Sequence, residues 1–127
     1  MNEKYFQESD GWLFATLNCF GLRKLKLDTI ISIGNTLNHA VFTLDQINEG
    51  LSRLEGDGFI EIRNSRIKFT PKGKNFIKSN KKNFEPCITW QLRYSELFSK
   101  MHLENEIVYK QYFDKEEYEF ITNKYYN

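Results

Sequence analysis

The sequence lacks most of the motifs on which enzymes and membrane proteins depend. It has no glycine-rich loop of the kind that holds phosphates, and its two histidines, His39 and His102, stand apart from each other and from any serine or carboxylate motif. Its longest apolar run is far shorter than the ~20 residues of a membrane-spanning helix. We therefore expect no enzyme activity, no cofactor, no metal site and no contact with a membrane.

Cysteine is also scarce, because the 127 residues include only Cys19 and Cys87. The pair has neither CxxC spacing nor histidine partners at the intervals of a zinc site, which favours two reduced thiols. A disulfide would require that the two Cα atoms lie within about 7 Å, and the sequence does not show that distance. Residues 1–10 are polar and mixed in charge, unlike a secretion signal, so we expect a cytoplasmic location.

The overall composition is that of one globular domain with an appendage. Hydrophobic residues make up 40% of the chain and charged residues 28%, values that fit neither a disordered chain nor a membrane protein. The net charge is only +1, yet the stretch of residues 63–82 contains no acid. Its eight basic residues are Arg63, Arg66, Lys68, Lys72, Lys74, Lys78, Lys81 and Lys82. A charge separation of this kind steers anionic partners towards one surface.

Three segments in the first half of the chain carry the apolar spacing of amphipathic helices. Asp10 can cap a helix over residues 10–20, and residues 27–37 place their apolar side chains on one face. A third helix is predicted to follow Thr43, because Thr43 and Gln46 have the spacing of a capping box. The core side of this third helix is expected to consist of Leu44, Ile47, Leu51 and Leu54.

Residues 59–70 have the pattern of a two-stranded hairpin. Apolar and polar residues alternate on both sides of a turn at residues 64–65, where asparagine tolerates the positive φ that a two-residue turn demands. The short β-prone segment at residues 41–43 could add a third strand. After the hairpin, Thr70 and Pro71 predict the start of a fourth helix.

Residues 84–127 are expected to form a helical, aromatic-rich arm. Their spacing indicates a helix over residues 88–103 and a terminal helix capped by Asp114. One apolar stripe of the first arm helix consists of Trp90, Tyr94, Leu97 and Met101. If that stripe packs on residues 10–20, a second subunit of a homodimer can cover the five apolar residues that remain: Leu92, Phe98, Tyr118, Ile121 and Tyr125. In the alternative arrangement, the arm folds back and completes the core of the monomer.

The run from Thr43 to Gly73, TLDQINEGLSRLEGDGFIEIRNSRIKFTPKG, resembles the winged-helix superfamily of bacterial regulators. The recognisable parts are the helix ending in Leu51-Ser52-Arg53-Leu54, the following Gly58-Phe59-Ile60, the hairpin, and Thr70-Pro71-Lys72-Gly73. The resemblance covers residues 10–80 and implies an α+β, mostly helical fold: a winged helix with a two- or three-stranded β-hairpin wing, followed by the C-terminal helical arm. It also implies a dimeric transcriptional regulator that binds double-stranded DNA.

In that superfamily, the helix before the hairpin enters the major groove and the wing touches the DNA backbone. The positions that would face outward on this helix are Asp45, Gln46, Glu49, Ser52 and Arg53. The resemblance implies base contacts for Gln46, Ser52 and Arg53, whereas the two carboxylates would repel DNA. The expected phosphate contacts of the wing are Arg63, Arg66 and Lys68, continued by Lys72, Lys74 and Lys78.

Two other interpretations fit the same residues. The basic side chains could simply form the solvated face of a hairpin edge. The fold could also serve as a non-enzymatic module for protein–protein interaction, with the acidic third helix or the aromatic arm facing the partner.

Overall fold

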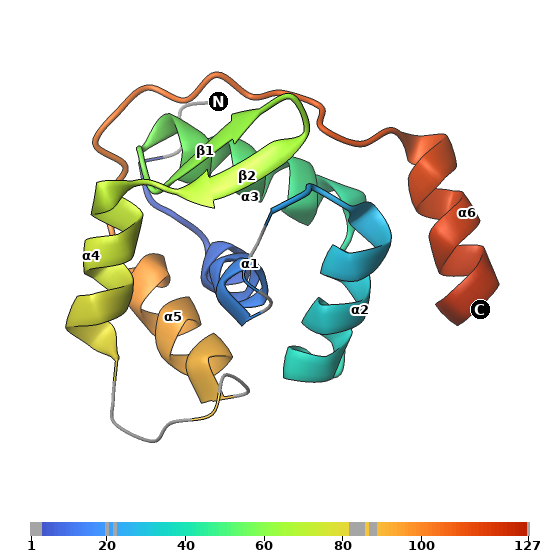
Figure 1. The fold of residues 1–127 in the computed structure, drawn as a ribbon, viewed down its shortest axis with the longest axis horizontal. Coiled ribbons are helices and arrows are strands. Elements are labelled where there is room, and N and C mark those ends of the chain that lie inside the picture. Colours follow the sequence, from blue (N-terminus) through green and yellow to red (C-terminus); the bar gives the residue numbers. More distant parts are fainter. Residues whose placement is uncertain (1–3, 20, 22, 82–85, 87–88, 127) are drawn as a thin grey trace.

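The computed structural model describes residues 4–19, 21, 23–81, 86 and 89–126. Within these residues, helices and one two-stranded antiparallel sheet account for the regular structure (Figure 1). The elements are α1 (Glu8–Cys19), α2 (Leu27–Asn38), α3 (Leu44–Gly56), β1 (Ile60–Arg63), β2 (Arg66–Phe69), α4 (Pro71–Asn80), α5 (Trp90–Ser99) and α6 (Lys115–Tyr126). The expected α+β, mostly helical class is confirmed. None of the described helices combines the length and apolarity needed to cross a membrane.

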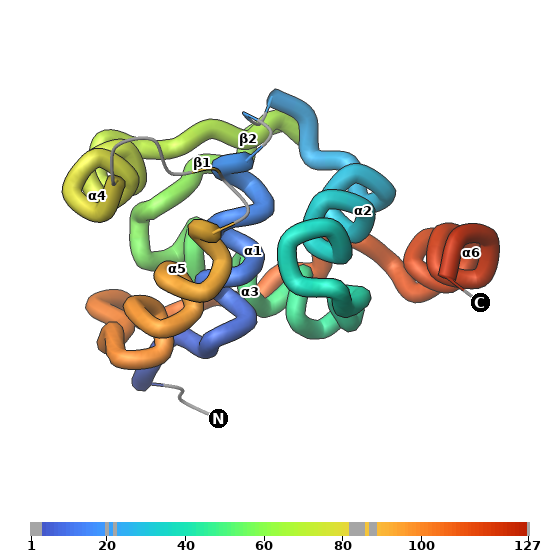
Figure 2. The backbone as a smooth tube through the Cα atoms, turned by 90° about the horizontal axis from the view of Figure 1, so that it is seen from below, coloured from blue at the N-terminus to red at the C-terminus, as the bar shows by residue number. Residues whose placement is uncertain are grey.

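Helix α1 occupies the centre of the molecule (Figures 1 and 2). Helices α2, α3 and α5 all contact it, and every residue from Asp10 to Leu17 is buried. The sequence predicted only one apolar face, because the spacing of apolar residues does not show that a helix is surrounded by others. The helix begins at Glu8, ahead of the expected cap, and Asp10 accepts a hydrogen bond of 2.8 Å from the backbone N–H of Gln7.

The predicted caps of the later helices are confirmed. Thr43 and Gln46 form a complete capping box, with hydrogen bonds of 3.0 and 2.9 Å between each side chain and the other residue's backbone N–H. Thr70 and Asp114 each accept a hydrogen bond from the backbone N–H three residues further on, at 3.1 and 2.8 Å. These contacts satisfy donors that the first turn of a helix leaves free, so they can be predicted from local sequence.

The hairpin turn also has the predicted conformation, with φ angles of 53° and 59° at its two residues. Its register places Arg63 opposite Arg66. A further antiparallel bridge joins Arg66 to Lys24, which lies between α1 and α2. This isolated bridge, rather than residues 41–43, lies beside the hairpin, and the sheet has two strands. The expectation for residues 41–43 is wrong, because Phe42 points into the core.

An aromatic cluster joins the hairpin and the arm to α1. The ring of Phe14 lies within 6.0 Å, between centroids, of five other rings: Phe59, Phe69, Phe76, Tyr94 and Phe98. Most of these pairs meet edge to face, a geometry that stabilises aromatic contacts beyond the burial of their area. The inner side of the hairpin and helix α5 therefore belong to one core.

The described part of the arm packs on its own chain. Helix α5 lies along α1 and buries Gln91, Tyr94 and Phe98. The buried side is thus rotated from the expected stripe, in which Leu97 and Met101 were to face the core; both are only half-buried. The helix is also shorter than residues 88–103, and residue 88 lies outside the described residues.

The five residues expected at a dimer contact do not form one surface. Phe98 and Ile121 are buried, and the half-buried Tyr118 donates its hydroxyl hydrogen to a backbone carbonyl between α2 and α3. Leu92 and Tyr125 are exposed, but their helices α5 and α6 lie on opposite sides of the molecule (Figures 1 and 2). The expectation that Phe98 and Ile121 remain free for a second subunit is wrong, because the core of the same chain already covers them.

Cys19, at the end of α1, is disulfide-bonded. This contradicts the expectation of two reduced thiols. The only other cysteine of the chain, Cys87, lies outside the described residues.

Candidate nucleic-acid interface

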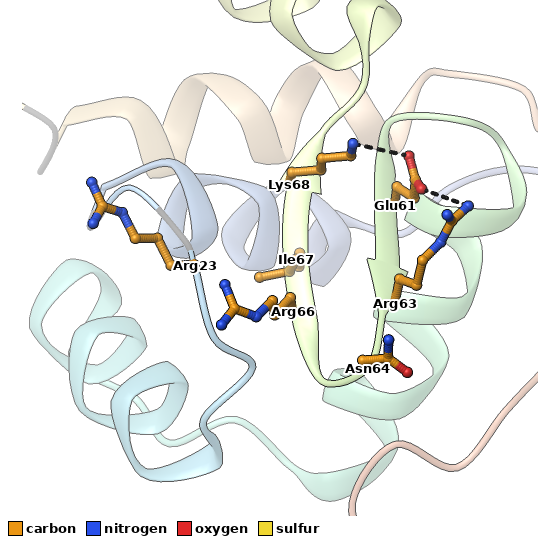
Figure 3. A pocket seen from close by; sticks show the side chains of 7 residues that line it. All are labelled: Arg23, Glu61, Arg63, Asn64, Arg66, Ile67 and Lys68. Carbon is orange, nitrogen blue, oxygen red and sulfur yellow. Dashed lines mark ion pairs between the residues drawn. The ribbon is translucent and has the colours of Figure 1, made fainter.

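The outer face of the hairpin is charged, because the apolar residues of both strands turn inward. Glu61, Arg63, Arg66 and Lys68 occupy this outer face (Figure 3). Glu61 forms ion pairs with Arg63 at 3.0 Å and with Lys68 at 3.7 Å. Among the residues that the structure describes, no acid lies within ion-pair distance of Arg66. One carboxylate is therefore shared by two of the three bases, and the third has none.

A row of three basic side chains crosses this face. Arg66 lies opposite Arg63 in the hairpin and opposite Lys24 in the bridge, and two backbone hydrogen bonds of 2.8 and 3.2 Å flank the bridge. Residues directly opposite each other in a sheet share a face, with Cβ atoms about 4.5–5.5 Å apart, and like charges in such pairs are destabilising. We call Lys24, Arg66 and Arg63 the cation row. Glu61 offsets the charge of Arg63 at 3.0 Å, whereas the adjacent charges of Lys24 and Arg66 repel each other.

Shallow hollows adjoin the cation row. One of about 410 Å³ is lined by Arg23, Ile67 and outer-face residues of the hairpin (Figure 3). A second, of about 530 Å³, includes Arg23 and Lys24 and extends to Lys26 and Thr29 at the start of α2. The connection between α1 and α2 thus adds exposed bases to the surface.

The contribution of residues 23–26 was not expected from the sequence. The signal is visible there as Arg23-Lys24-Leu25-Lys26, a cluster of bases just before α2. Only the pairing of Lys24 with Arg66 brings this cluster beside the hairpin. Such a contact between distant parts of the chain leaves no local pattern, whereas the bases of the hairpin form a continuous run.

The lysines of α4, which were expected to continue the basic surface, lie apart from the cation row. Lys72 donates a hydrogen bond of 2.8 Å to the backbone carbonyl of Asp57, and its ammonium group lies 3.3 Å from the carboxylate of Glu104. These two oxygens hold Lys72 near the end of α3, and its contact with phosphate stays a prediction. Lys74 and Lys78 are exposed, but α4 lies at the end of the hairpin that is remote from the turn (Figure 1).

Helix α3 does not present the expected base-reading residues. The side chain of Gln46 is used in the capping box. Ser52 is only 1% exposed and donates to the carbonyl of Asn48 at 2.9 Å. Arg53 is 2% exposed, and its guanidinium donates to both carboxylate oxygens of Asp10, at 2.7 and 3.0 Å. The expectation that Ser52 and Arg53 face outward is wrong, because α1 and the arm bury this side of α3.

Residues 104–113 of the arm run in extended form along α3, and we call this segment the strap (Figure 1). Asn48 holds its far end with three hydrogen bonds. The side-chain carbonyl of Asn48 accepts from the backbone N–H groups of Tyr112 and Phe113, both at 3.0 Å. Its amide nitrogen donates to the carbonyl of Phe113, also at 3.0 Å. Asn48 therefore takes the place of a neighbouring β-strand for this part of the strap.

Two other side chains of this region hold the strap by its backbone. The hydroxyl of Ser52 accepts from the backbone N–H of Lys110 at 2.9 Å. Just after α3, one carboxylate oxygen of Asp57 accepts from the backbone N–H groups of Glu104 and Asn105, both at 2.9 Å. The strap is thus fixed at both ends and in the middle, along the side of α3 that carries Asn48 and Ser52.

A tyrosine side chain adds a fourth point of attachment. The hydroxyl of Tyr112 donates to the carboxylate of Glu55 at 2.5 Å, and the ammonium group of Lys110 lies 3.3 Å from the same carboxylate. Burial, followed by the hydrogen bond to Glu55, raises the pKa of Tyr112 well above its ordinary value. The phenol therefore keeps its proton, and this hydrogen bond, into alkaline solution.

Replacing Asn48 by alanine should loosen the strap selectively. The variant leaves the N–H groups of Tyr112 and Phe113 without their partner, and we expect a loss of stability of about 1–3 kcal/mol. Amide hydrogen exchange should accelerate most at these two residues. Thr36→Ala, which removes only a hydroxyl bonded within an exposed part of α2, is the control. Unchanged exchange in the strap of Asn48→Ala would contradict this role of Asn48.

The remaining chemistry and the comparisons identify no reaction or family. In the part of the chain that the structure covers, no three His, Cys, Asp or Glu side chains gather as a metal site would require. Comparisons with protein-family models, curated proteins and solved structures returned no match. The cation row and the strap are therefore the features from which a function can be argued.

Proposed function

We propose that the protein is a non-enzymatic, winged-helix DNA-binding domain that holds the phosphate backbone of double-stranded DNA through the cation row. The order of three helices and a hairpin supports this arrangement, with Lys24 at the position of a third strand. The observation that carries the proposal is the direct opposition of Lys24, Arg66 and Arg63 on one exposed face. The process served is transcriptional regulation, as the resemblance implies.

The geometry favours phosphate contact over a merely solvated hairpin. A solvated face gains from opposite charges in cross-strand pairs, as Glu61 and Lys68 illustrate. The cation row has the opposite pattern, which becomes favourable when phosphates lie against it and release their condensed counterions. A single chain supplies the whole row, so the proposal does not require a dimer.

Removing the cation row should abolish most of the binding. We expect the variant Lys24→Gln, Arg63→Gln, Arg66→Gln to bind duplex DNA about 100-fold more weakly at low salt, because three phosphate contacts are lost. The dependence of log Kd on log salt should become less steep by about 3. Fluorescence anisotropy with a labelled duplex measures both quantities, and circular dichroism checks the fold.

A matched variant separates the cation row from net charge. Lys74→Gln, Lys78→Gln, Lys81→Gln removes the same charge from exposed positions along and just beyond α4, and its affinity should stay within about threefold of the original. Equal losses from the two variants would mean that only total charge matters. An unchanged affinity in the folded cation-row variant would remove the row from the mechanism.

The alternative function, a protein–protein interaction module, draws on the exposed apolar side chains of the arm, which include Leu92, Val108, Phe120 and Tyr125. Leu92 on α5 is 74% exposed, a large apolar side chain without cover in this structure. On α3, the other surface considered for a partner, the strap contacts Asn48 and Ser52, whereas Asp45 is exposed. A protein that fails to bind DNA at low salt would favour this alternative, with the arm as its contact surface.

A further inference from the structure

We infer that the protein binds double-stranded DNA without discriminating base sequence, an inference that rests on the proposed function. Sequence is read by groups that reach base edges, whereas phosphate contacts position a protein without reading bases. In the arrangement that the resemblance implies, α3 would supply the reading groups. The strap, the charge of α3 and the side on which α3 lies each exclude it from that role.

The strap is a physical barrier over α3. A recognition helix must place side chains several ångströms deep in the major groove, with its own surface against the bases. Here Asn48 and Ser52 point at the strap backbone instead and are bonded to it at 2.9–3.0 Å. Entry of α3 into a groove would require that these hydrogen bonds break and that the buried Phe113 leave the core.

The charge of α3 opposes DNA even where the strap leaves it open. Its two acids outside the contacts with the strap are Asp45, which is exposed, and Glu49, whose side chain is 44% exposed. The single base of the helix, Arg53, is 2% exposed and donates to the buried Asp10, and its guanidinium also lies 3.8 Å from the carboxylate of Glu49. A surface of this sign repels both phosphates and the acceptor-rich edges of guanine.

The two edges of the hairpin also separate α3 from the cation row. At the free edge of β1, the carboxylate of Glu55 accepts a hydrogen bond from the backbone N–H of Ile62 at 3.1 Å, so α3 closes this edge. The bridge with Lys24 lies on the other edge, along β2. The cation row therefore extends from the hairpin away from α3, and a duplex centred on the row has α3 at its margin.

The first test compares duplexes of equal length, about 20 base pairs, with AT-rich, GC-rich and mixed sequences. We expect their Kd values for the full-length protein to agree within about tenfold, whereas specific binders discriminate by roughly 10³-fold or more. A preference beyond about tenfold for one duplex would overturn the inference and leave the proposed function standing. Failure to bind any of the duplexes would instead contradict the proposed function.

The second test places a new positive charge on either the hairpin or α3. Glu61→Lys and Asp45→Lys make the same change in charge at the outer hairpin face and at the exposed start of α3. At ~0.15 M salt, charges more than ~8 Å from the DNA are largely screened. We expect Glu61→Lys to tighten binding about tenfold and Asp45→Lys to change it less than about twofold.

The two variants distinguish a failure of the inference from a failure of the proposed function. Tightening by Asp45→Lys to the same extent as by Glu61→Lys would place α3 on the DNA and overturn the inference. Binding that tightens in neither folded variant would mean that the cation row is not the contact surface, which contradicts the proposed function. Thermal unfolding of both variants checks that each is folded at the temperature of the assay.

Discussion

Replacing Gly11 by alanine should destabilise the protein by about 3 kcal/mol, which corresponds to a fall in Tm of roughly 10 °C for a chain of this size. The reason is a backbone contact between α1 and α5. A Cβ atom at Gly11 would lie 2.3 Å from the backbone carbon and oxygen of Tyr94 and 2.4 Å from the nitrogen of Ser95. Backbone atoms within a helix cannot rotate away as a side chain can, so the two helices must move apart.

Gly56→Ala is the matched control for this clash. There the nearest atom to an added Cβ is the terminal methyl carbon of Ile107, at 2.8 Å. The end of a flexible side chain can move, and alanine also favours the helix, so we expect a change below about 1 kcal/mol. Chemical denaturation of both variants measures the difference. Equal stability of Gly11→Ala and Gly56→Ala would contradict the packing of α5 on α1 and, with it, the arm that folds back on the monomer.

Arg53→Ala should be at least as damaging, with an expected loss of about 3–5 kcal/mol. The guanidinium of Arg53 is 3% exposed and the carboxylate of Asp10 is fully buried. Removal of the arginine leaves a buried negative charge that has lost the two hydrogen bonds of 2.7 and 3.0 Å from the guanidinium and keeps the one from the backbone N–H of Gln7. Arg66→Ala removes the same type of side chain from the exposed hairpin and should cost less than about 0.5 kcal/mol.

A double variant distinguishes the loss of the ion pair from the cost of leaving the Asp10 carboxylate buried without its counter-ion. Asp10→Leu with Arg53→Met replaces both charges by apolar groups, and we expect it to be more stable than Arg53→Ala, because no unpaired charge remains. Denaturant unfolding of the single and double variants gives the coupling free energy. A double variant less stable than either single variant would contradict this account of the ion pair.

The elements predicted correctly are those that depend on interactions between residues close together in the sequence. The capping box of Thr43 and Gln46, the helix start at Thr70 and the turn at residues 64–65 depend on groups within a few residues of each other. The buried side of α3 also followed from its spacing, because Ile47, Leu51 and Leu54 are all fully buried. Such local patterns can be recognised in the sequence without knowledge of the tertiary contacts.

The candidate site was predicted less well, because burial of a polar residue depends on distant partners. Arg53 has the spacing of an outward position on α3, and its partner Asp10 was assigned to the cap of another helix. Ser52 is covered by a strap that has no regular secondary structure and no periodic pattern. Lys24 joins the hairpin through a single bridge. None of these contacts could be predicted without the paths of the connections between elements.

The proposed contact surface consists of the hairpin, which was predicted from the sequence, and of residues 23–26, which were not. Arg63 and Arg66 were expected on the wing from the alternation of β2 and β1, and the structure places both on the outer face of the hairpin. The bases of residues 23–26 enlarge that surface, whereas Lys72 lies on α4 and forms ion pairs with Asp57 and Glu104. The surface is therefore centred on the hairpin and the start of α2 rather than on α3 and α4.

The most direct test of this account is the salt dependence of duplex DNA binding by the unmodified protein. If the cation row and one or two neighbouring bases engage about four phosphates, a plot of log binding constant against log salt should be linear with a slope of about −4. Binding that is undetectable at about 50 mM salt and tens of micromolar protein, or a slope near zero, would contradict the proposed contact with the DNA backbone.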